Sequence, residues 1–356
     1  MFLSSRNNAG RLWSVLGSML LVITILLAWS LSPAWADSDK RIVKVMTRNM
    51  DAGTDLLYFF VELLDAALAD TLAEISASNF PVRAALIADE IAREQPYLIS
   101  LQEVTLWQFI LPGYESTGLA DQLNLLVAAL AARNLHYEVI ASQDLTDITV
   151  PLPTGWLFRF LDRNVVLARS DLKQAELALS NIQTGIYEAR IQPIPALGFF
   201  EINGWISVDA KIRGKSIRFF STHLESAISQ TDYTQMYQAI ELITIMQRCK
   251  LPVILAGNFN SDADHTGNWY DQTPTADWIM SAGYQDVWSA THAPGDLGLT
   301  WPFYSEDSVP YPAAPLERID LIFARDLTIL DAHLTGITYP YGSDHAGVVS
   351  TLMIDK

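Results

Sequence analysis

The chain has 356 residues, of which 50% are hydrophobic and 18% are charged, a composition that favours a globular protein with ample core material. Its net charge of −17 argues against an architectural DNA-binding protein, which needs a basic surface, and only weakly against a metal-dependent nuclease. The single cysteine, Cys249, excludes an intrachain disulfide and thiolate zinc sites, and its place in an expected helix favours a structural thiol.

The N-terminus has the features of a secretory signal. Two arginines precede an apolar run at residues 12–31, and Ala34-Trp35-Ala36 follows it. This order predicts a signal peptide over residues 1–36, cleaved after Ala36, and a folded domain over residues 37–356. Because the apolar run is long, an uncleaved membrane anchor is the alternative. Either way the domain is expected to be extracytoplasmic: periplasmic, secreted or membrane-anchored.

The first half of the chain alternates short apolar runs with segments of helical period. The expected elements are a strand at 41–50, helices at 51–78 and 81–94, a strand at 97–101, a helix at 119–134 and strands at 137–141 and 165–168. The helix at 51–78 is predicted to cover the sheet or to form a lid, and its acidic polar face disfavours membrane contact. Residues 142–160 are rich in proline, glycine and aromatic residues and are predicted to form a long loop.

The second half begins with another predicted loop, at residues 183–204, and a hairpin. The expected elements are hairpin strands at 205–212 and 216–220, a helix at 233–248, a strand at 252–256, a short helix at 275–282, a proline-rich loop at 293–315 and strands at 320–324 and 348–354. Strands alternate first with helices and then with hairpins. The order therefore predicts an α/β layered protein with mixed sheets.

Polar residues gather where the predicted strands end, which is where such sheets commonly place their chemistry. They are Asn49, Glu103, Asp162, His223, Asn258, Asn260, Asp320, Asp344 and His345. Hard oxygen ligands and amides suit Mg²⁺, with Mn²⁺ or Ca²⁺ as alternatives. Two histidines suit acid–base work or stabilisation of a charged transition state. A cation beside histidines, without a nucleophilic serine motif, predicts attack of water on a phosphoester.

The same residues also have structural interpretations. An asparagine at a strand end can simply cap the strand, a buried carboxylate can form an ion pair, and a lone histidine is more often structural than catalytic. The functional interpretation is favoured because so many of these groups recur at one kind of position.

Six short motifs occur in order between Val43 and the C-terminus, and each is weak alone. They are Thr47-Arg48-Asn49, Leu101-Gln102-Glu103-Val104, Ser221-Thr222-His223-Leu224, Gly257-Asn258-Phe259-Asn260, Arg318-Ile319-Asp320 and Ser343-Asp344-His345. Together they resemble the endonuclease/exonuclease/phosphatase superfamily, which includes pancreatic-type deoxyribonucleases, abasic-site endonucleases, bacterial sphingomyelinases and inositol polyphosphate 5-phosphatases. The resemblance implies a four-layer α/β sandwich of two mixed β-sheets flanked by helices.

The resemblance also implies roles for the strand-end residues. By motif matching, Glu103 is the main metal ligand, and Asn49 and Asp344 support the metal site. His345 is expected to contact the scissile phosphate, and Asp320 is expected to orient His345.

A second set of roles comes from the nuclease and sphingomyelinase branches of that superfamily. His223 matches their second phosphate-facing histidine. Asp162 lies just before a predicted strand, where the deoxyribonucleases place a carboxylate partner for that histidine. Asn260 is expected to orient the attacking water or to hold a phosphate oxygen.

Asn258 departs from the family pattern, which has an aspartate at this position to activate the water. An amide cannot accept a proton at neutral pH. Three interpretations follow: the metal alone acidifies the water and turnover is slow, Asp262 or Asp264 acts as a substitute base, or the protein is a binding module that has lost turnover. Retained activity is favoured because the other motifs are intact.

The expected partner is a phosphoester substrate. An extracytoplasmic location disfavours a role in DNA repair, which leaves a secreted nuclease, a sphingomyelinase-like phospholipase or a hydrolase of small phosphoesters. Nucleic acid is expected only as a substrate, membrane contact only through an uncleaved N-terminal segment, and the protein is expected to be a monomer.

Overall fold

The computed structural model describes residues 41–354 except 57–58, 61, 63–67, 115–116, 193–194, 228, 230–231, 266–272 and 304–313. The expected signal peptide lies outside these residues, as do parts of the predicted helix at 51–78 and of the predicted loop at 293–315. None of the helices in the described ranges combines the length and the apolar character needed to span a membrane. One structural unit spans Ile42–Lys356.

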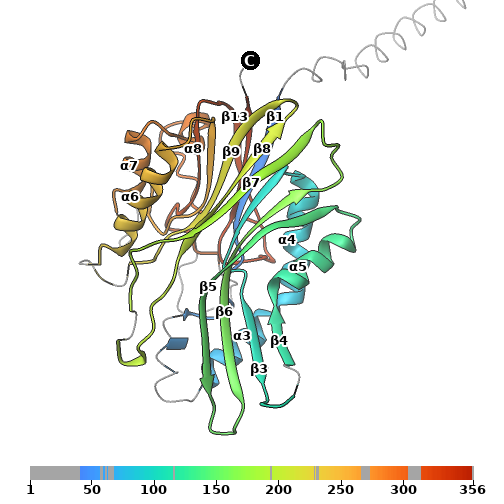
Figure 1. Ribbon diagram of the computed structural model, residues 1–356, viewed down its shortest axis with the longest axis vertical. Coiled ribbons are helices and arrows are strands. Elements are labelled where there is room, and N and C mark those ends of the chain that lie inside the picture. The colour runs from blue at the N-terminus through green and yellow to red at the C-terminus, as the bar shows by residue number, and fades with distance from the viewer. Residues whose placement is uncertain are drawn as a thin grey trace, which may run out of the picture. The chain divides into compact units, whose positions relative to one another are not determined.

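Two β-sheets form the centre of this unit (Figure 1). Within the described residues, the larger sheet has eight strands in the order β13-β14-β1-β2-β6-β3-β4, with β5 paired to β6. β1 is parallel to β2 and antiparallel to β14, so the sheet is mixed. Its strands are β1 (Ile42–Asn49), β2 (Leu98–Gln102), β3 (Leu106–Ile110), β4 (Thr117–Asp121), β5 (Tyr137–Pro151), β6 (Leu157–Arg169), β13 (Thr328–Thr335) and β14 (Gly347–Met353).

The smaller sheet has six strands among the described residues, in the order β11-β12-β10-β9-β8-β7. They are β7 (Leu177–Ile186), β8 (Gly204–Ile212), β9 (Lys215–His223), β10 (Val253–Asn258), β11 (Gln285–Asp286) and β12 (Asp320–Arg325). β9 and β10 are parallel, and β12 runs antiparallel to β10. The last residues of β9 and β10 therefore lie beside the first residue of β12, at one edge of the sheet.

Helices cover the outer faces of both sheets (Figure 1). Through a cluster that includes Ile87 and Leu126, α4 and α5 pack on the larger sheet, whereas α6 and α7 pack on the smaller sheet through Leu242 and Ile279. This arrangement confirms the predicted four-layer sandwich. The helices are α3 (Ala69–Ser78), α4 (Phe80–Glu94), α5 (Gln122–Ala131), α6 (Thr234–Gln247), α7 (Thr275–Ser281) and α8 (Val287–Thr291), with a 3₁₀ turn at Pro195–Leu197.

The central strands are apolar on both faces because both faces are covered. On β6, Val165 and Leu167 belong to the cluster under α4 and α5, whereas Val166 and Ala168 belong to the cluster between the sheets. Successive strand residues point to opposite faces, so a strand covered on both sides is an unbroken apolar run in the sequence.

A small polar layer interrupts the otherwise largely apolar contact between the two sheets. Ser100 Oγ on β2 lies 2.6 Å from Ser221 Oγ on β9 and donates to the Ala256 carbonyl of β10 at 3.2 Å. Gln102 Nε2 donates to Ser100 Oγ at 2.6 Å. Apolar contacts have no preferred direction, whereas hydrogen bonds do, so these hydroxyls fix the position of one sheet on the other.

The predicted loop at 142–160 was wrong in large part, whereas the predicted loop at 183–204 was confirmed except at its two ends. Residues 142–160 form most of the long β5–β6 hairpin, whose turn closes with hydrogen bonds from Leu152 N to Trp156 O and from Gly155 N to Leu152 O. Of residues 183–204, only those up to Ile186, in β7, and Gly204, the first residue of β8, belong to these strands. β5 and β7 have an exposed face with many polar residues, which hides the apolar pattern of a strand.

Smaller differences concern helix ends. The predicted helix at 119–134 begins at Gln122, because the residues before it form β4. The strand β3 was not predicted. α3 begins after Leu68, which has a left-handed backbone (φ 46°). α6 ends at Gln247, so Cys249 lies just beyond the helix, half-buried against the cluster around Leu242.

Glu317, just before β12, is fully buried, and neither carboxylate oxygen has a hydrogen-bond partner among the residues that the structure describes. Burial and the nearby Asp262 raise the pKa of Glu317 from 4.5 to about 7. Because the folded-state pKa is the higher one, the free energy of unfolding is expected to fall as pH rises through this range. Glu317→Gln is therefore expected to raise the free energy of unfolding by about 1–3 kcal/mol at pH 8 and by much less at pH 4.5. Urea unfolding of the variant and of the wild type at pH 8 and pH 4.5 measures these differences, and the exposed Glu138→Gln is the control. Equal pH dependence in Glu317→Gln and the wild type would contradict this expectation.

Candidate active site

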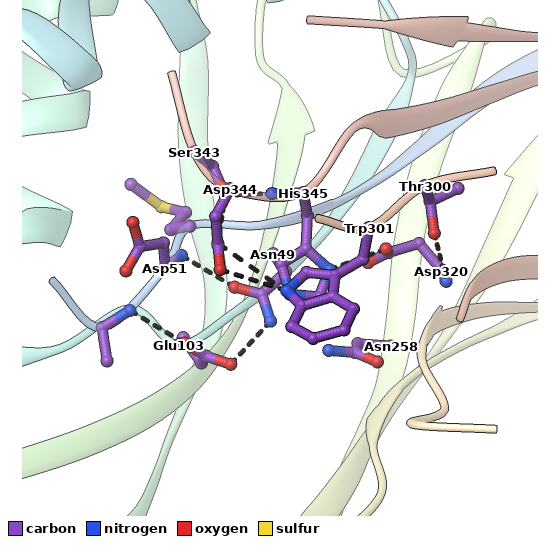
Figure 2. A network of polar contacts seen from close by, with 12 residues as sticks. Asn49, Asp51, Glu103, Asn258, Thr300, Trp301, Asp320, Ser343, Asp344 and His345 are labelled. Carbon is purple, nitrogen blue, oxygen red and sulfur yellow. Dashed lines mark hydrogen bonds and ion pairs between the residues drawn. The ribbon is translucent and has the colours of Figure 1, made fainter. Parts of the chain in front are cut away.

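The site residues predicted at strand ends lie at one edge of the two sheets. Asn49 ends β1, His223 ends β9 and Asn258 ends β10, whereas Asp320 begins β12. Asn258 pairs with His223 on one neighbouring strand and with Asp320 on the other. Figure 2 shows several of these side chains converging with residues of the loop that precedes β14.

Glu103 is held in a fixed orientation immediately after β2. Its backbone is left-handed (φ 52°), a conformation that costs a non-glycine residue about 1 kcal/mol. Oε1 accepts a hydrogen bond from Asn49 Nδ2 at 2.7 Å, and Oε2 accepts one from Ala52 N at 2.8 Å. Asn49 Oδ1 in turn accepts from Asp51 N at 2.7 Å. The predicted main metal ligand is therefore fixed by the end of β1.

Three carboxylates around this point lie close enough to influence one another's pKa. Burial raises the pKa of Asp51, Glu103 and Asp344, and their mutual repulsion raises it further: Asp344 acts on Asp51, Asp51 on Glu103, and Glu103 on Asp344. A divalent cation relieves such repulsion. The residues therefore fit a bound cation, and Asp51 is a member of the site that sequence analysis missed, although it lies two residues after Asn49.

Few protein side chains are placed to bind a cation in this site. Among the residues that the structure describes, no three Asp, Glu, His or Cys side chains form a ready metal-binding group. Mg²⁺ often uses only one or two carboxylates and retains several waters. Glu103 and Asp344 would supply the carboxylates for such an ion, with the amide oxygen of Asn49 as a further donor.

His345 and Asp320 form a buried hydrogen-bonded pair, with Nδ1 and Oδ2 2.8 Å apart. Burial alone would lower the pKa of His345, but the carboxylates of Asp320 and Asp344 outweigh burial and raise it to about 9. At neutral pH this raised pKa favours the protonated imidazole, whose Nε2 lies 4.0 Å from Asp344 Oδ1.

Thr300 and Trp301 complete this side of the site. Thr300 Oγ1 accepts hydrogen bonds from the backbone N–H groups of Ile319 and Asp320, both at 3.1 Å, which fixes the start of β12. Trp301 Nε1 donates to Asp344 Oδ2 at 3.2 Å, and its ring centroid lies 6.3 Å from that of His345 (Figure 2). Both residues were predicted to lie in a loop, and neither was predicted to contact the strand-end carboxylates, because only the fold brings them there.

His223 lies on the other side of Asn258 from Asp320, on the neighbouring strand β9. Burial and the positive charge of His345 lower the pKa of His223 to about 4. Its Nε2 lies 3.3 Å from Asn260 Nδ2 and 3.9 Å from Glu103 Oε1. Nδ1 is buried and has no hydrogen-bond partner among the described residues. His223 is thus a neutral imidazole beside the predicted metal ligand.

The predicted partner of His223, Asp162, does not hydrogen-bond to it. Asp162 lies inside β6 rather than before a strand, and its Oδ1 accepts from Arg163 N at 2.8 Å. Burial and the charge of Glu103 raise the pKa of Asp162 to about 7. The structure therefore brings Asp162 near Glu103 without the expected pair.

Asn258 has a defined amide orientation. Its Oδ1 accepts from Asn260 N at 2.9 Å, and a backbone N–H can only donate, so the other atom is Nδ2. Nδ2 is buried and has no partner among the described residues, and in Figure 2 it lies on the side of Trp301. Asn260, with a left-handed backbone (φ 45°), donates from Nδ2 to the Leu224 carbonyl at 2.9 Å. Asn258 thus offers the site a hydrogen-bond donor.

The sequence profile of the Endonuclease/Exonuclease/phosphatase family matches residues 72–345. The chain belongs to this family. Its members hydrolyse phosphoesters. No curated protein matches the sequence.

Solved structures share the fold of this family member. An endonuclease/exonuclease/phosphatase from Beutenbergia cavernae is 22% identical, with a TM-score of 0.58 over 88% of this chain and 72% of that one. The mannosyl-6-phosphatase Bt3783 of Bacteroides thetaiotaomicron is 17% identical (TM-score 0.53, 87% and 99% covered). TDP2 of D. rerio in complex with single-strand DNA product is 16% identical (TM-score 0.51, 87% and 98% covered). At these identities the likeness establishes the fold alone.

The acidic residues after Asn260 are engaged elsewhere in this family member. Asp264 binds the Arg318 guanidinium with both oxygens, at 2.6 and 3.3 Å. Asp262 is fully buried and accepts from the backbone N–H groups of Arg318 and Asp264. Both carboxylates hold the segment before β12, which disfavours either as a substitute for the family's usual aspartate.

Proposed function

We propose that the protein is an extracytoplasmic, divalent-metal-dependent phosphoester hydrolase in which water is the nucleophile. The observation that carries this proposal is the hydrogen-bonded pair of His345 and Asp320, with Nδ1 and Oδ2 2.8 Å apart, beside the carboxylates of Asp51, Glu103 and Asp344. A cation site next to a fixed positive charge suits a substrate that gains negative charge in the transition state. Family membership supports a phosphoester as that substrate.

Each part of the site has a task in this reaction. A bound Mg²⁺ supplies a Lewis acid that polarises the phosphate and lowers the pKa of water. His345 donates from Nε2 to a phosphate oxygen, and Asp320 keeps the imidazole charged and oriented. Asn258 Nδ2 donates to a phosphate oxygen, or to the lone pair of the water that is not used in the attack. Because Asn258 takes up no proton, we expect slow turnover.

The alternative is a family member that binds its ligand or metal and is catalytically impaired. One observation favours it: the atom that Asn258 presents is an amide donor, where the family pattern has a carboxylate. Tight binding of Mg²⁺ or of a phosphoester without product would support this alternative.

We propose that the substrate is a nucleic acid, a phospholipid or a small phosphoester.

The proposed extracytoplasmic location rests on the N-terminal sequence, and fractionation of cells that express the protein with and without residues 1–36 tests this location. Size-exclusion chromatography with light scattering tests the expected monomer.

The purified protein is expected to hydrolyse at least one of DNA, sphingomyelin and bis-nitrophenyl phosphate in the presence of Mg²⁺. EDTA is expected to abolish product formation, because the water then lacks its Lewis acid, and excess Mg²⁺ is expected to restore it. Glu103→Gln should reproduce the effect of EDTA, whereas the exposed Glu138→Gln should not. Hydrolysis that persists in EDTA would rule out the proposed mechanism.

A further inference from the structure

Two loops that are far apart in the sequence carry the cation-site residues, and one side chain of α4 touches both. Arg83 Nε donates to the Gly342 carbonyl at 3.0 Å, in the loop that leads to Asp344. Arg83 Nη2 donates to the carbonyls of Met50 and Asp51, the latter at 3.0 Å, in the loop that follows Asn49. The same guanidinium lies 3.2 Å from Asp51 Oδ2.

The guanidinium is itself held in place. Arg83 is only 9% exposed, its charged group lies 5.0 Å from the centroid of the Phe80 ring, and Nη1 donates to Ser78 Oγ. An arginine has five donors in one rigid plane, so it can bind carbonyls of two loops at once, which the single ammonium of a lysine does less well. Arg83 is therefore a rigid spacer rather than a mobile surface cation.

A second arginine supports the same two segments one layer deeper. Arg48, the residue before Asn49, is fully buried, donates from Nη1 to the His345 carbonyl and pairs through Nη2 with Glu90 Oε1 of α4 at 3.0 Å. A Cβ on Gly336 would lie 2.6 Å from Glu90 Oε1 and 2.7 Å from Arg48 Nη2, so this glycine makes room for the ion pair. Helix α4 thus anchors both loops.

We infer that Arg83 is a positioning residue for the cation site, setting the distance between the loop after β1 and the loop before β14. This inference rests on the proposed metal-dependent function. Arg83 does not need to touch substrate or metal. Its neutral replacement would free the Gly342 and Met50 carbonyls and let Asp51 and Asp344 separate, which lowers affinity for a cation held by few protein ligands.

Isothermal titration calorimetry of Mg²⁺ into the metal-free, full-length protein tests the inference. Arg83→Met is expected to weaken Mg²⁺ binding about 10–100-fold, the usual effect of removing a group that orients metal ligands, and Arg83→Lys is expected to recover part of the loss. In assays, the Mg²⁺ concentration for half-maximal rate should rise in parallel, while kcat at saturating Mg²⁺ stays within about threefold. Arg133→Met is the matched control, because Arg133 also pairs with α4, through the exposed Asp89.

The outcomes separate this inference from the function on which it rests. Folded Arg83→Met and Arg83→Lys variants that bind Mg²⁺ within twofold of the wild type would overturn the role of Arg83. If Arg83→Met does not fold, Arg83→Lys decides, and wild-type affinity and activation in that variant would overturn the role as well. A wild-type protein that neither binds Mg²⁺ nor needs it for hydrolysis would overturn the proposed function and the inference with it.

Discussion

Asn258→Asp is expected to raise kcat for Mg²⁺-dependent hydrolysis of bis-nitrophenyl phosphate about 10²-fold, the low end of what a positioned general base contributes. The new Oδ1 can keep the hydrogen bond from Asn260 N, and Oδ2 takes the place of the buried, unpartnered Nδ2. The substitution therefore adds a proton acceptor without moving the backbone. A gain in kcat with little change in KM would show that the acceptor acts on the chemical step.

The control for this gain is an asparagine that carries no role in the site. Asn134→Asp adds the same charge at an exposed position after α5 and is expected to leave kcat unchanged. If Asn258→Asp also leaves kcat unchanged, Asn258 does not face the water, and another group activates it.

Asp320→Asn is expected to lower kcat about 10²–10³-fold, or roughly 3–4 kcal/mol of transition-state stabilisation. The carboxylate holds His345 Nδ1 at 2.8 Å and is a main source of its raised pKa. An amide at this position keeps the shape but loses the charge, and it can orient the imidazole in the wrong tautomer. Steady-state kinetics at saturating Mg²⁺ measure the loss.

Asp326→Asn is the matched control, since Asp326 directly follows the same strand and is exposed. Melting temperatures of both variants should be compared, because Asp320 is buried. A folded Asp320→Asn variant with kcat within fivefold of the wild type would contradict a catalytic role for the charged pair.

The polar ends of the central strands could be predicted because the fold leaves them little freedom. Where both faces of a strand are buried, as at Val165 and Val166, the sequence is apolar until the strand reaches the edge of the sheet. Polar residues that follow such a run, such as Glu103 and Asn258, then lie at that edge. The four layers follow from the same pattern, because helices must cover both outer faces.

Contacts made across the chain could not be predicted in this way. The period of α4 shows that Arg83 lies on a helix, but nothing local indicates that its partner is the Gly342 carbonyl, 259 residues away. Asp162 was assigned to His223 from its position before an expected strand, whereas β6 begins five residues earlier, at Leu157. Of the edge strand β5, only residues 137–141 were predicted, because the exposed face of the remainder is polar.

The hydroxyl contact between Ser100 and Ser221 limits how far one sheet can slide on the other without disturbing the site. Glu103 belongs to the larger sheet and Asp320 to the smaller one, so the site spans a plane along which the sheets could slide. A slide of about 1 Å along the line from His345 Nδ1 to Asp320 Oδ2 would stretch their 2.8 Å hydrogen bond beyond its usual range and leave the non-directional apolar contacts almost unchanged. The site can therefore fail under a displacement much smaller than unfolding requires, and the hydrogen bonds between the sheets, among them those of Ser100 and the one from Asn164 Nδ2 to the Gly204 carbonyl, oppose that displacement.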